Sequence, residues 1–352
     1  MDTKIFKVND GALSASEPEL IRAGEVIRRG GLVIFPTETV YGLGADGTSA
    51  DACKKIYEAK GRPSDNPLII HIAKPSDAED YVYTGELYYR LAERFMPGPL
   101  TVIMRAKDTV PKETRAGLPT VAVRCPENPI ARRLIELSGV PIAAPSANLS
   151  GTPSPTSAEH VIADMQGRVD IIIDGGECAF GLESTIVKIE DDGSLTLLRP
   201  GKITPEELSE FADVTIAASV TAALREGERV LSPGMKYKHY APKSPVALLS
   251  GEVSDIRAFL EREARQGRIA YISYTEDIPE LSDIEGVTLY DLGARDDAIL
   301  QSHNLFSLLR KTDEGEYIAV FAPKPRTDGV HLALYNRLIR AAAHKIIDLK
   351  EV

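Results

Sequence analysis

The chain has few cysteines, no long apolar run and no excess of basic residues. Its three cysteines, Cys53, Cys125 and Cys178, lie far apart and are odd in number. They therefore suit neither a disulfide framework nor a CxxC metal site, and they indicate a reducing compartment. No apolar stretch approaches the roughly 18 residues of a membrane span, and the N-terminal residues lack the apolar core of a signal peptide. We therefore expect a soluble, cytoplasmic protein without a membrane partner.

The charge balance is acidic, with 41 Lys and Arg against 52 Asp and Glu and a net charge of −11. Proteins that bind nucleic acid through its phosphates usually carry a basic face. This balance argues against a nucleic-acid scaffold, and we expect no tight binding to tRNA. A local basic cavity is still compatible with the sequence, because residues 54–133 carry 14 Lys and Arg against 10 Asp and Glu.

Several common catalytic and nucleotide-binding sequence motifs are also missing. The chain has no P-loop, no HExxH pair and no Ser–His–Asp arrangement. The stretch GLGADG at 42–47 has the spacing of a dinucleotide loop, but the polar residues PTETVY precede it where a hydrophobic strand should lie. An NAD-dependent dehydrogenase is therefore only a minor alternative. The remaining polar candidates are cations, hydroxyls and amides, which suit substrate positioning and charge stabilisation better than covalent catalysis.

At 352 residues, the chain is long enough for two domains. Hydrophobic patterns in the first part predict alternating strands and helices of an irregular α/β domain. The expected strands are 31–36, 67–72, 100–105, 121–124, 141–144, 170–174, 185–189 and 195–198, and the expected helices are 18–29, 50–59, 86–95, 129–138 and 158–165. Ser49 and Asn128 stand where helix N-caps are expected.

The second part begins after a stretch rich in Pro, Lys and Tyr, SPGMKYKHYAPKSP at 232–245. This composition disfavours regular structure, so we interpret 213–244 as a linker. Beyond it, βαβ units predict a small parallel sheet with helices. Its strands are expected at 246–249, 268–273, 287–292 and 317–321, with helices at 253–266, 297–311 and 330–346. The predicted domains are 1–212 and 245–352.

Three polar segments stand where elements join. Lys60 and Arg62 lie in KGRPSDNPL, where two cations on a short rigid turn can clamp phosphate; an isolated turn of this kind is more often simply solvated. Ser146 and Asn148 follow an apolar strand in APSANLSG, which could equally be an ordinary polar loop. Arg199 closes a strand in LLRPG, where it could stack on an adenine ring or pair with phosphate.

Seven motifs occur together in a fixed order: PTETVYGLGAD, KGRPSDNPL, FMPGPLTVI, VAVRCP, APSANLSG, GLESTIV and LLRPG. In this order and spacing, residues 15–205 resemble the catalytic domain of the threonylcarbamoyl-AMP synthase family. The linker and the following α/β domain resemble the longer, two-domain form of that family.

The resemblance implies an N-terminal YrdC-like domain, a twisted mixed sheet with helices around an open concave cavity, and a smaller C-terminal Rossmann-like α/β domain. It implies a nucleotidyltransferase that converts L-threonine, bicarbonate and ATP into L-threonylcarbamoyl-AMP and pyrophosphate. Mg²⁺ would accompany ATP, held mainly by its phosphates rather than by a dedicated protein site. A tRNA threonylcarbamoyl-transferase machinery would then use the product in tRNA modification.

The resemblance also implies roles for individual residues, as expectations. The catalytic group would be Lys60, Arg62, Ser146 and Asn148. Further ATP contacts would be Asn66, Thr120, Ser154, Arg199, Tyr237 and His239, and the threonine pocket would be Thr39, His71, Arg124, Ala144 and Ser184. Within the linker, Tyr237 or His239 would fold over the cavity and shield an intermediate that water can hydrolyse.

Two further functions remain as alternatives. A concave basic domain could hold double-stranded RNA, although the acidic net charge weighs against tight binding. A related enzyme could use carbamoyl phosphate to make carbamoyl-AMP, but such proteins carry additional domains that this chain lacks.

Overall fold

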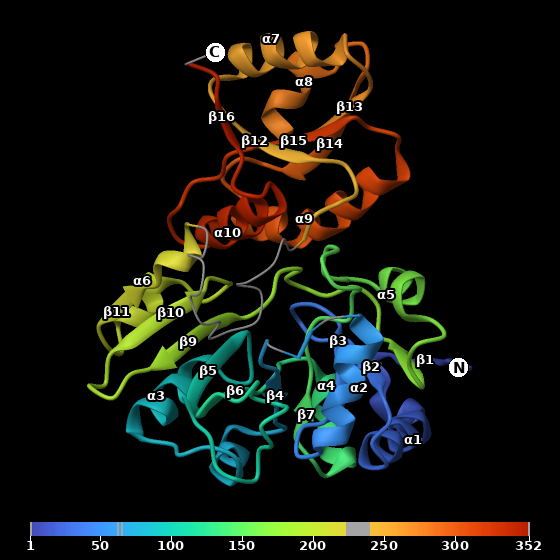
Figure 1. Ribbon diagram of the computed structural model, residues 1–352, viewed down its shortest axis with the longest axis vertical. Helices are drawn as coiled ribbons and strands as arrows, with labels where there is room; N and C mark the ends of the chain where they lie inside the picture. The colour runs from blue at the N-terminus through green and yellow to red at the C-terminus, as the bar shows by residue number, and fades with distance from the viewer. Residues whose placement is uncertain (1, 62, 65, 223–239, 351–352) are drawn as a thin grey trace.

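The computed structural model describes residues 2–61, 63–64, 66–222 and 240–350. Figure 1 shows two bodies, a larger one built from the N-terminal part and a smaller one built from the C-terminal part. The expected residues Arg62, Tyr237 and His239 lie outside the described residues.

The larger body contains an 11-stranded mixed sheet with the order β1-β8-β2-β3-β7-β4-β6-β5-β9-β10-β11. Parallel pairs such as β4 with β6 alternate with antiparallel pairs such as β5 with β6. The strands are β1 (Lys4–Lys7), β2 (Val33–Phe35), β3 (Gly42–Asp46), β4 (Ile69–His71), β5 (Leu100–Arg105), β6 (Thr120–Arg124), β7 (Ile142–Ala143), β8 (Ile171–Asp174), β9 (Thr185–Ile189), β10 (Leu195–Arg199) and β11 (Val214–Ile216).

Helices cover both faces of this sheet. They are α1 (Glu17–Arg28), α2 (Ala50–Lys60), α3 (Glu86–Phe95), α4 (Pro129–Ser138), α5 (Ala158–Met165) and α6 (Pro205–Ser209), with short 3-10 helices at η1 (Asp10–Ser16), η2 (Pro75–Asp80) and η3 (Ala218–Val220). The two expected caps are confirmed: Ser49 accepts from the amide of Ala52, and Asn128 accepts from the amides of Ile130 and Ala131. Both helices end at a glycine with positive φ, as in an αL cap.

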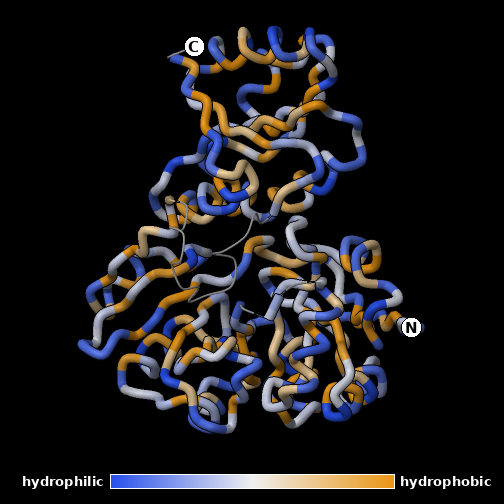
Figure 2. The backbone as a smooth tube through the Cα atoms, viewed as in Figure 1, coloured by the Kyte–Doolittle hydropathy of each residue, from blue (hydrophilic) through white to orange (hydrophobic). Residues whose placement is uncertain are grey.

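Alternate residues of the buried strands face opposite layers of the core. Ile34 of β2 packs with α2 and α3, whereas its neighbours Val33 and Phe35 pack against α1 and α4. This is the two-residue period of a strand buried on both sides. Figure 2 shows apolar segments on strands and helices of both bodies, interspersed with polar ones.

The glycine-rich stretch at 42–47 forms strand β3 instead of a nucleotide loop. It pairs antiparallel with β2 through Gly44 and Val33. A Cβ atom on Gly44 would lie 2.7 Å from the Phe35 ring and 2.7 Å from Ile142. Close packing therefore explains the glycine here, and the dinucleotide-loop alternative has no structural support at this position.

The smaller body contains a parallel sheet with the order β14-β13-β15-β12-β16. Helices α7 and α8 pack on one face and α9 and α10 on the other, which is a doubly wound, Rossmann-like arrangement. The elements are β12 (Val246–Ser250), α7 (Val253–Ala264), β13 (Ile269–Tyr274), η4 (Thr275–Asp277), α8 (Ile278–Leu281), β14 (Val287–Gly293), α9 (Ala298–Lys311), η5 (Thr312–Glu314), β15 (Ala319–Pro323), α10 (His331–Ala341) and β16 (Ile346–Asp348).

The end of the chain differs from its expected pattern. A helix was expected over 330–346, but α10 ends at Ala341 because Ala343 and His344 adopt φ values of 48° and 65°. These left-handed residues turn the chain so that β16 pairs with β12. Strand β11 lies inside the expected linker and pairs with β10, so the larger sheet extends past residue 212.

The two bodies share one apolar cluster. Val40, Phe180 and Leu182 of the larger body pack in the same cluster as Phe306 of α9 and Leu334 of α10. Figure 1 shows α9 and α10 on the side of the smaller sheet that faces the larger body. Among the described residues, no helix is long and apolar enough to cross a membrane.

Candidate active site

Five of the seven motifs meet at a cavity of about 50 Å³ in the larger body. Its lining is predominantly polar and draws on several strand ends and on the segment before β12. The lining residues are Thr37, Val40, Tyr41, Gly42, Ile69, His71, Arg124, Ala144, Pro145, Ser146, Asn148, Glu183, Arg199 and Tyr240.

Neighbouring strands bring these side chains together. Strands β4 and β6 run parallel with His71 opposite Arg124, and β7 lies on the other side of β4. The loop that follows β7 carries Ser146, which forms an isolated bridge with Gly42 at the start of β3. Loops at strand ends thus place the motif residues around one hollow, a common location for binding groups.

Arg124 lines this cavity and forms a buried ion pair with Glu38, which is not among the lining residues. Nη2 of Arg124 lies 2.7 Å from Oε1 of Glu38, and the two side chains are only 4% and 9% exposed. Within the described part of the chain, Nε of Arg124 has no hydrogen-bond partner. A planar guanidinium with a free donor can still bind a carboxylate. The site therefore has a fixed positive group with capacity for an anionic ligand.

His71 is neutral in this environment. Its Nδ1 lies 3.2 Å from the carbonyl oxygens of Ile69 and Ile142, so this nitrogen carries the hydrogen. Burial, and next the positive charge of Arg124, lower the pKa of His71 to about 3. The other nitrogen, Nε2, is then a hydrogen-bond acceptor and a weak base. His71 is suited to orienting a substrate donor rather than to storing a proton.

Arg199 is held by the GLESTIV segment. Its Nε donates to the carbonyl of Ser184 at 3.0 Å and its Nη2 donates to the Ser184 hydroxyl at 3.1 Å. Burial lowers the pKa of Arg199 to about 10 against the opposite effect of Glu183. Arg199 is therefore still charged at neutral pH, and together with Arg124 it makes the cavity a site for anionic groups.

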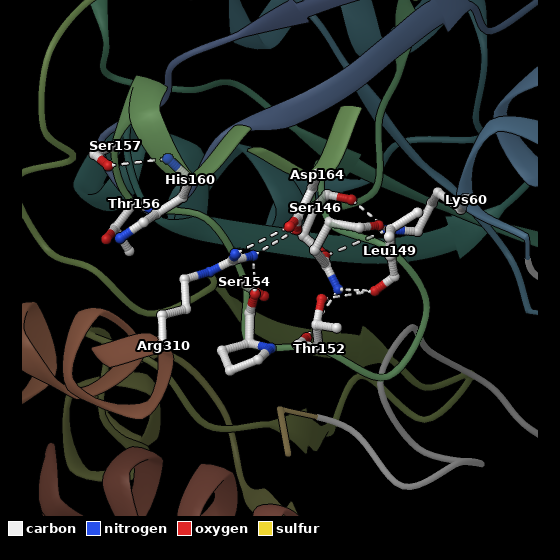
Figure 3. Close-up of polar contacts among 12 residues, drawn as sticks. Lys60, Ser146, Leu149, Thr152, Ser154, Thr156, Ser157, His160, Asp164 and Arg310 are labelled. Carbon is white, nitrogen blue, oxygen red and sulfur yellow. Dashed lines mark hydrogen bonds and ion pairs between the residues drawn. The ribbon is translucent and has the colours of Figure 1, made fainter. Parts of the chain in front are cut away.

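Lys60 supports the loop that carries Ser146 and Asn148. Its Nζ donates to the carbonyls of Ser146 and Asn148 at 2.5 and 2.7 Å, and the Ser146 hydroxyl donates to Oδ1 of Asn148 at 2.6 Å. Figure 3 shows Lys60 reaching toward this loop from the right of the view, with Thr152 and Leu149 below Ser146. The amide of Asn148 donates to the carbonyls of both, which closes the loop on itself.

The structure brings together most of the described residues expected from the sequence. His71, Arg124, Ala144, Ser146, Asn148 and Arg199 line the cavity. Thr39, Ser154 and Ser184 contact lining residues: Thr39 bonds to Thr37 at 2.8 Å, Ser154 to Glu183 at 2.6 Å, and Ser184 to Arg199. The ligand roles of all these residues remain predictions.

Two expected ATP contacts are not brought to the cavity. Thr120 begins strand β6 while Arg124 ends it, which separates them by about 13 Å at the rise of a β-strand. Asn66 is fully buried in the turn before β4, and its carbonyl accepts from the Tyr57 hydroxyl at 3.0 Å. Neither residue is among the described residues that line the cavity.

Sequence reasoning missed two acids of the site: Glu183, which lines the cavity, and Glu38, which pairs with the lining residue Arg124. Thr37, Tyr41 and Tyr240 also line the cavity without having been assigned a role. The signal was present, because Glu38 lies in PTETVY and Glu183 in GLESTIV, two of the motifs that carry the resemblance. A buried acid beside a buried arginine cannot be recognised before their pairing across the fold is known.

The three cysteines are poorly suited to nucleophilic chemistry at neutral pH. All three are buried and free, and burial raises the pKa of Cys53 to about 11, that of Cys125 to about 12 and that of Cys178 further still. Among the described residues, no group of three or more His, Cys, Asp or Glu could hold a metal ion. Glu38 and Glu183 are each paired with an arginine instead.

A large mixed sheet with a polar cavity, joined to a doubly wound parallel domain, defines a two-domain enzyme of the Sua5 and YrdC class. Residues 25–201 match the family described as "Telomere recombination", whose name combines Sua5, YciO and YrdC, and residues 203–343 match "Threonylcarbamoyl-AMP synthase, C-terminal domain". The chain belongs to the threonylcarbamoyl-AMP synthase family.

Relatives of known identity agree over nearly the whole length. The chain is 44% identical to the threonylcarbamoyl-AMP synthase of Bacillus subtilis over 95% of this chain and 96% of the relative. It is 42% identical to that of Pyrococcus abyssi, over 92% of this chain and 94% of the relative. The crystal structure of Pyrococcus abyssi Sua5 complexed with L-threonine superposes with a TM-score of 0.87 at 40% identity, covering 98% and 99% of the two chains. The expected fold class is thereby confirmed.

Proposed function

We propose that this cavity makes L-threonylcarbamoyl-AMP and pyrophosphate from L-threonine, bicarbonate and ATP, the first step of threonylcarbamoyladenosine formation in tRNA. One observation carries the assignment of the site. Two buried arginines, a neutral histidine and the Ser146–Asn148 loop supported by Lys60 share one small hollow. The Pyrococcus abyssi relative, which shares this fold, is described as a complex with L-threonine.

The threonine end of the cavity is built around Arg124. Its guanidinium lines the cavity and offers charged donors to the substrate carboxylate. Nε2 of His71, in a neutral ring, offers an acceptor for the substrate ammonium. Ala144, Ser184 and Thr39 complete this end as small or hydroxyl-bearing neighbours. A zwitterionic amino acid thus meets a cation for its carboxylate and a hydrogen-bond acceptor for its ammonium.

The chemistry requires two bond-forming steps. Bicarbonate takes up a proton and loses water to give carbon dioxide, and the deprotonated amine of threonine attacks its carbon, which forms a carbamate and releases a proton. An oxygen of the carbamate then attacks the α-phosphorus of ATP, the bond to the bridging oxygen breaks, and pyrophosphate leaves. No protein nucleophile is needed, so the contribution of the chain is positioning and charge stabilisation. Lys60, Ser146, Asn148 and Arg199 are the described residues that we assign to ATP, with Arg62 as a further cation.

Mg²⁺ would enter with ATP and neutralise charge on its phosphates. The described residues fit this assignment, because Ser146 and Asn148 offer a hydroxyl and an amide oxygen, the type of ligand that Mg²⁺ accepts. We place the enzyme in the cytoplasm, in keeping with three buried free thiols. Its product would pass to a tRNA threonylcarbamoyl-transferase machinery.

The test is pyrophosphate release from ATP and Mg²⁺ with threonine and bicarbonate present or omitted. Release that needs both substrates, and that Lys60→Ala or Arg62→Ala removes, is the expected result. Release with carbamoyl phosphate in their place would instead identify a carbamoyl-AMP-forming enzyme. No release under any combination, together with a salt-dependent shift of bare tRNA, would identify an RNA-binding module.

A further inference from the structure

Arg337, in the C-terminal domain, is the largest fully buried side chain among the described residues. It lies in the middle of α10 with 0% exposure, where an unpaired guanidinium would be very unfavourable. Its partners are all in place. Nε donates to Oε2 of Glu183 at 2.9 Å, Nη2 to the carbonyl of Glu183 at 3.3 Å, and Nη1 to the carbonyl of Pro200 at 2.9 Å.

These contacts bridge two motifs of the catalytic domain. Glu183 precedes Ser184, and Pro200 follows Arg199. Ser184 and Arg199 are themselves bonded to each other through the carbonyl and the hydroxyl of Ser184. The guanidinium of Arg337 therefore fixes the backbone on both sides of this pair, from outside the catalytic domain. The planar guanidinium has five donors in a fixed geometry, so it can bond to both segments at once, whereas an ammonium cannot.

The same arginine completes the charge balance at the wall of the cavity. Glu183 lines the cavity, and its Oε1 accepts from the Ser154 hydroxyl at 2.6 Å. Arg337 of α10, Arg199 of β10 and Tyr240 also face it, the last with its ring 5.9 Å from the guanidinium carbon of Arg337. Tyr240 in turn stacks on Phe306 of α9 at 5.1 Å.

We propose that Arg337 is a positioning residue for the reaction: the C-terminal domain uses it to hold Glu183 and Pro200, and thereby sets Arg199 and Ser184 toward the substrates. The proposal rests on the function proposed for the cavity. It gives the C-terminal domain a defined part in catalysis that goes beyond covering the site. A purely structural ion pair between domains is the competing explanation.

Titration of Glu183 separates the two explanations. Burial raises the pKa of Glu183, but Arg337 and Arg199 outweigh it and lower the value to about 2. Glu183 is thus a carboxylate between pH 5 and pH 8. Without the charge of Arg337, only Arg199 and the Ser154 hydroxyl still lower the pKa of Glu183 against the effect of burial. The pKa of Glu183 is then higher than in wild type, and its carboxylate takes up a proton at a higher pH. Activity should then fall more steeply on the acidic side than that of wild type, whose pH dependence comes from the substrates.

The experiment compares Arg337→Gln and Arg337→Lys with wild type in pyrophosphate release from pH 5 to pH 8. For Arg337→Gln we expect kcat/KM to fall roughly 100-fold, with a higher KM for ATP and threonine and a new acidic limb. Arg337→Lys keeps the charge, so it should lack the acidic limb but retain a raised KM because it cannot reach both Glu183 and Pro200. Thermal melting of each variant shows whether it is folded.

The matched control is Asp164→Asn in α5, which weakens another ion pair between the domains. Asp164 accepts from both terminal nitrogens of Arg310 in α9, at 3.1 and 2.7 Å, and does not line the cavity. Figure 3 shows Arg310 extending from the C-terminal domain toward Asp164. This variant should melt at a lower temperature and keep wild-type KM values and pH profile.

Folded Arg337→Gln with wild-type KM values and pH profile would overturn the proposal, as would equal effects in Asp164→Asn. If Arg337→Gln does not fold, Arg337→Lys provides the test. Wild-type KM values in Arg337→Lys would contradict a role for the guanidinium that bonds to both Glu183 and Pro200. Wild-type enzyme that releases no pyrophosphate would instead reject the function proposed for the cavity.

Discussion

Arg124, which lines the cavity, contacts Glu38 at 2.7 Å between Nη2 and Oε1, and both side chains are almost fully buried. Each comes from a different motif, VAVRCP and PTETVY. In such a pair the loss of one partner is far more harmful than the loss of both, because the remaining charge is buried without compensation. Since a bound threonine carries both charges, the pair couples substrate binding to stability.

We expect Glu38→Gln to lower the free energy of unfolding by about 3–5 kcal/mol without substrate, because Arg124 is left buried and uncompensated. Threonine should restore part of this loss, since its carboxylate supplies the missing negative charge. The measurement is the melting temperature with and without threonine. The rise on adding threonine should be larger in Glu38→Gln than in wild type, and an equal or smaller rise would contradict the placement of the carboxylate at Arg124.

Acid should destabilise the protein in part through His71. Its folded pKa of about 3 lies below the ordinary value of 6.5, so the unfolded chain binds a proton that the folded protein excludes. The stabilising contribution is complete above pH 6.5 and decreases as the pH falls toward 3, by about 1.4 kcal/mol for each pH unit.

Urea midpoints at pH 7, 6 and 5 test this prediction. The free energy of unfolding should fall less steeply with falling pH in His71→Gln than in wild type. At the acidic end of this range, the difference in slope should approach the uptake of one proton. His160, whose pKa burial also lowers, to about 4, serves as comparison, since His160→Gln should remove a similar slope without affecting threonine binding. An unchanged slope in His71→Gln would show that this ring titrates normally.

We expect Lys60 to affect ATP binding indirectly, because it holds the loop that carries Ser146 and Asn148. In Lys60→Met the carbonyls of Ser146 and Asn148 lose their donor, and the loop is free to shift. We expect kcat/KM for ATP to fall roughly 100-fold. Threonine should still raise the melting temperature normally. Lys54 on the same helix is exposed and pairs only with Asp51 among the described residues, so Lys54→Met should leave the kinetics unchanged.

Much of the fold could be predicted from local patterns. Helices with clear 3.6-residue spacing and recognisable caps, such as α2 after Ser49 and α4 after Asn128, were expected within a residue or two of their observed bounds. The buried strands β2, β5 and β9 were also predicted, because a strand that is buried on both faces appears in the sequence as a continuous apolar run. Short edge strands such as β1 and β11 were missed, since their few residues carry no distinctive period.

The site could be predicted only as a set of motifs. Lys60, Ser146 and Asn148 were expected to lie together, and the structure adds that Lys60 binds the loop carbonyls. The partners of the arginines could not be inferred, because Glu38 and Arg124 are 86 positions apart and Glu183 and Arg337 are 154 apart. Pairing at that separation depends on strand order and on the docking of the two domains, neither of which leaves a local signal.

The glycine-rich stretch at 42–47 offers a last prediction, because it separates packing from nucleotide binding. In β3 a Cβ atom on Gly44 would lie 2.7 Å from both the Phe35 ring and Ile142. Gly44→Ala should therefore destabilise the protein by about 1–3 kcal/mol, through a forced shift of buried side chains. The measurement is the urea midpoint of folding. Gly85→Ala is the control, since nothing lies within 4 Å of a Cβ at that exposed position. If Gly44→Ala instead kept wild-type stability and lost the fluorescence signal of bound NADH, the stretch would be a dinucleotide site after all.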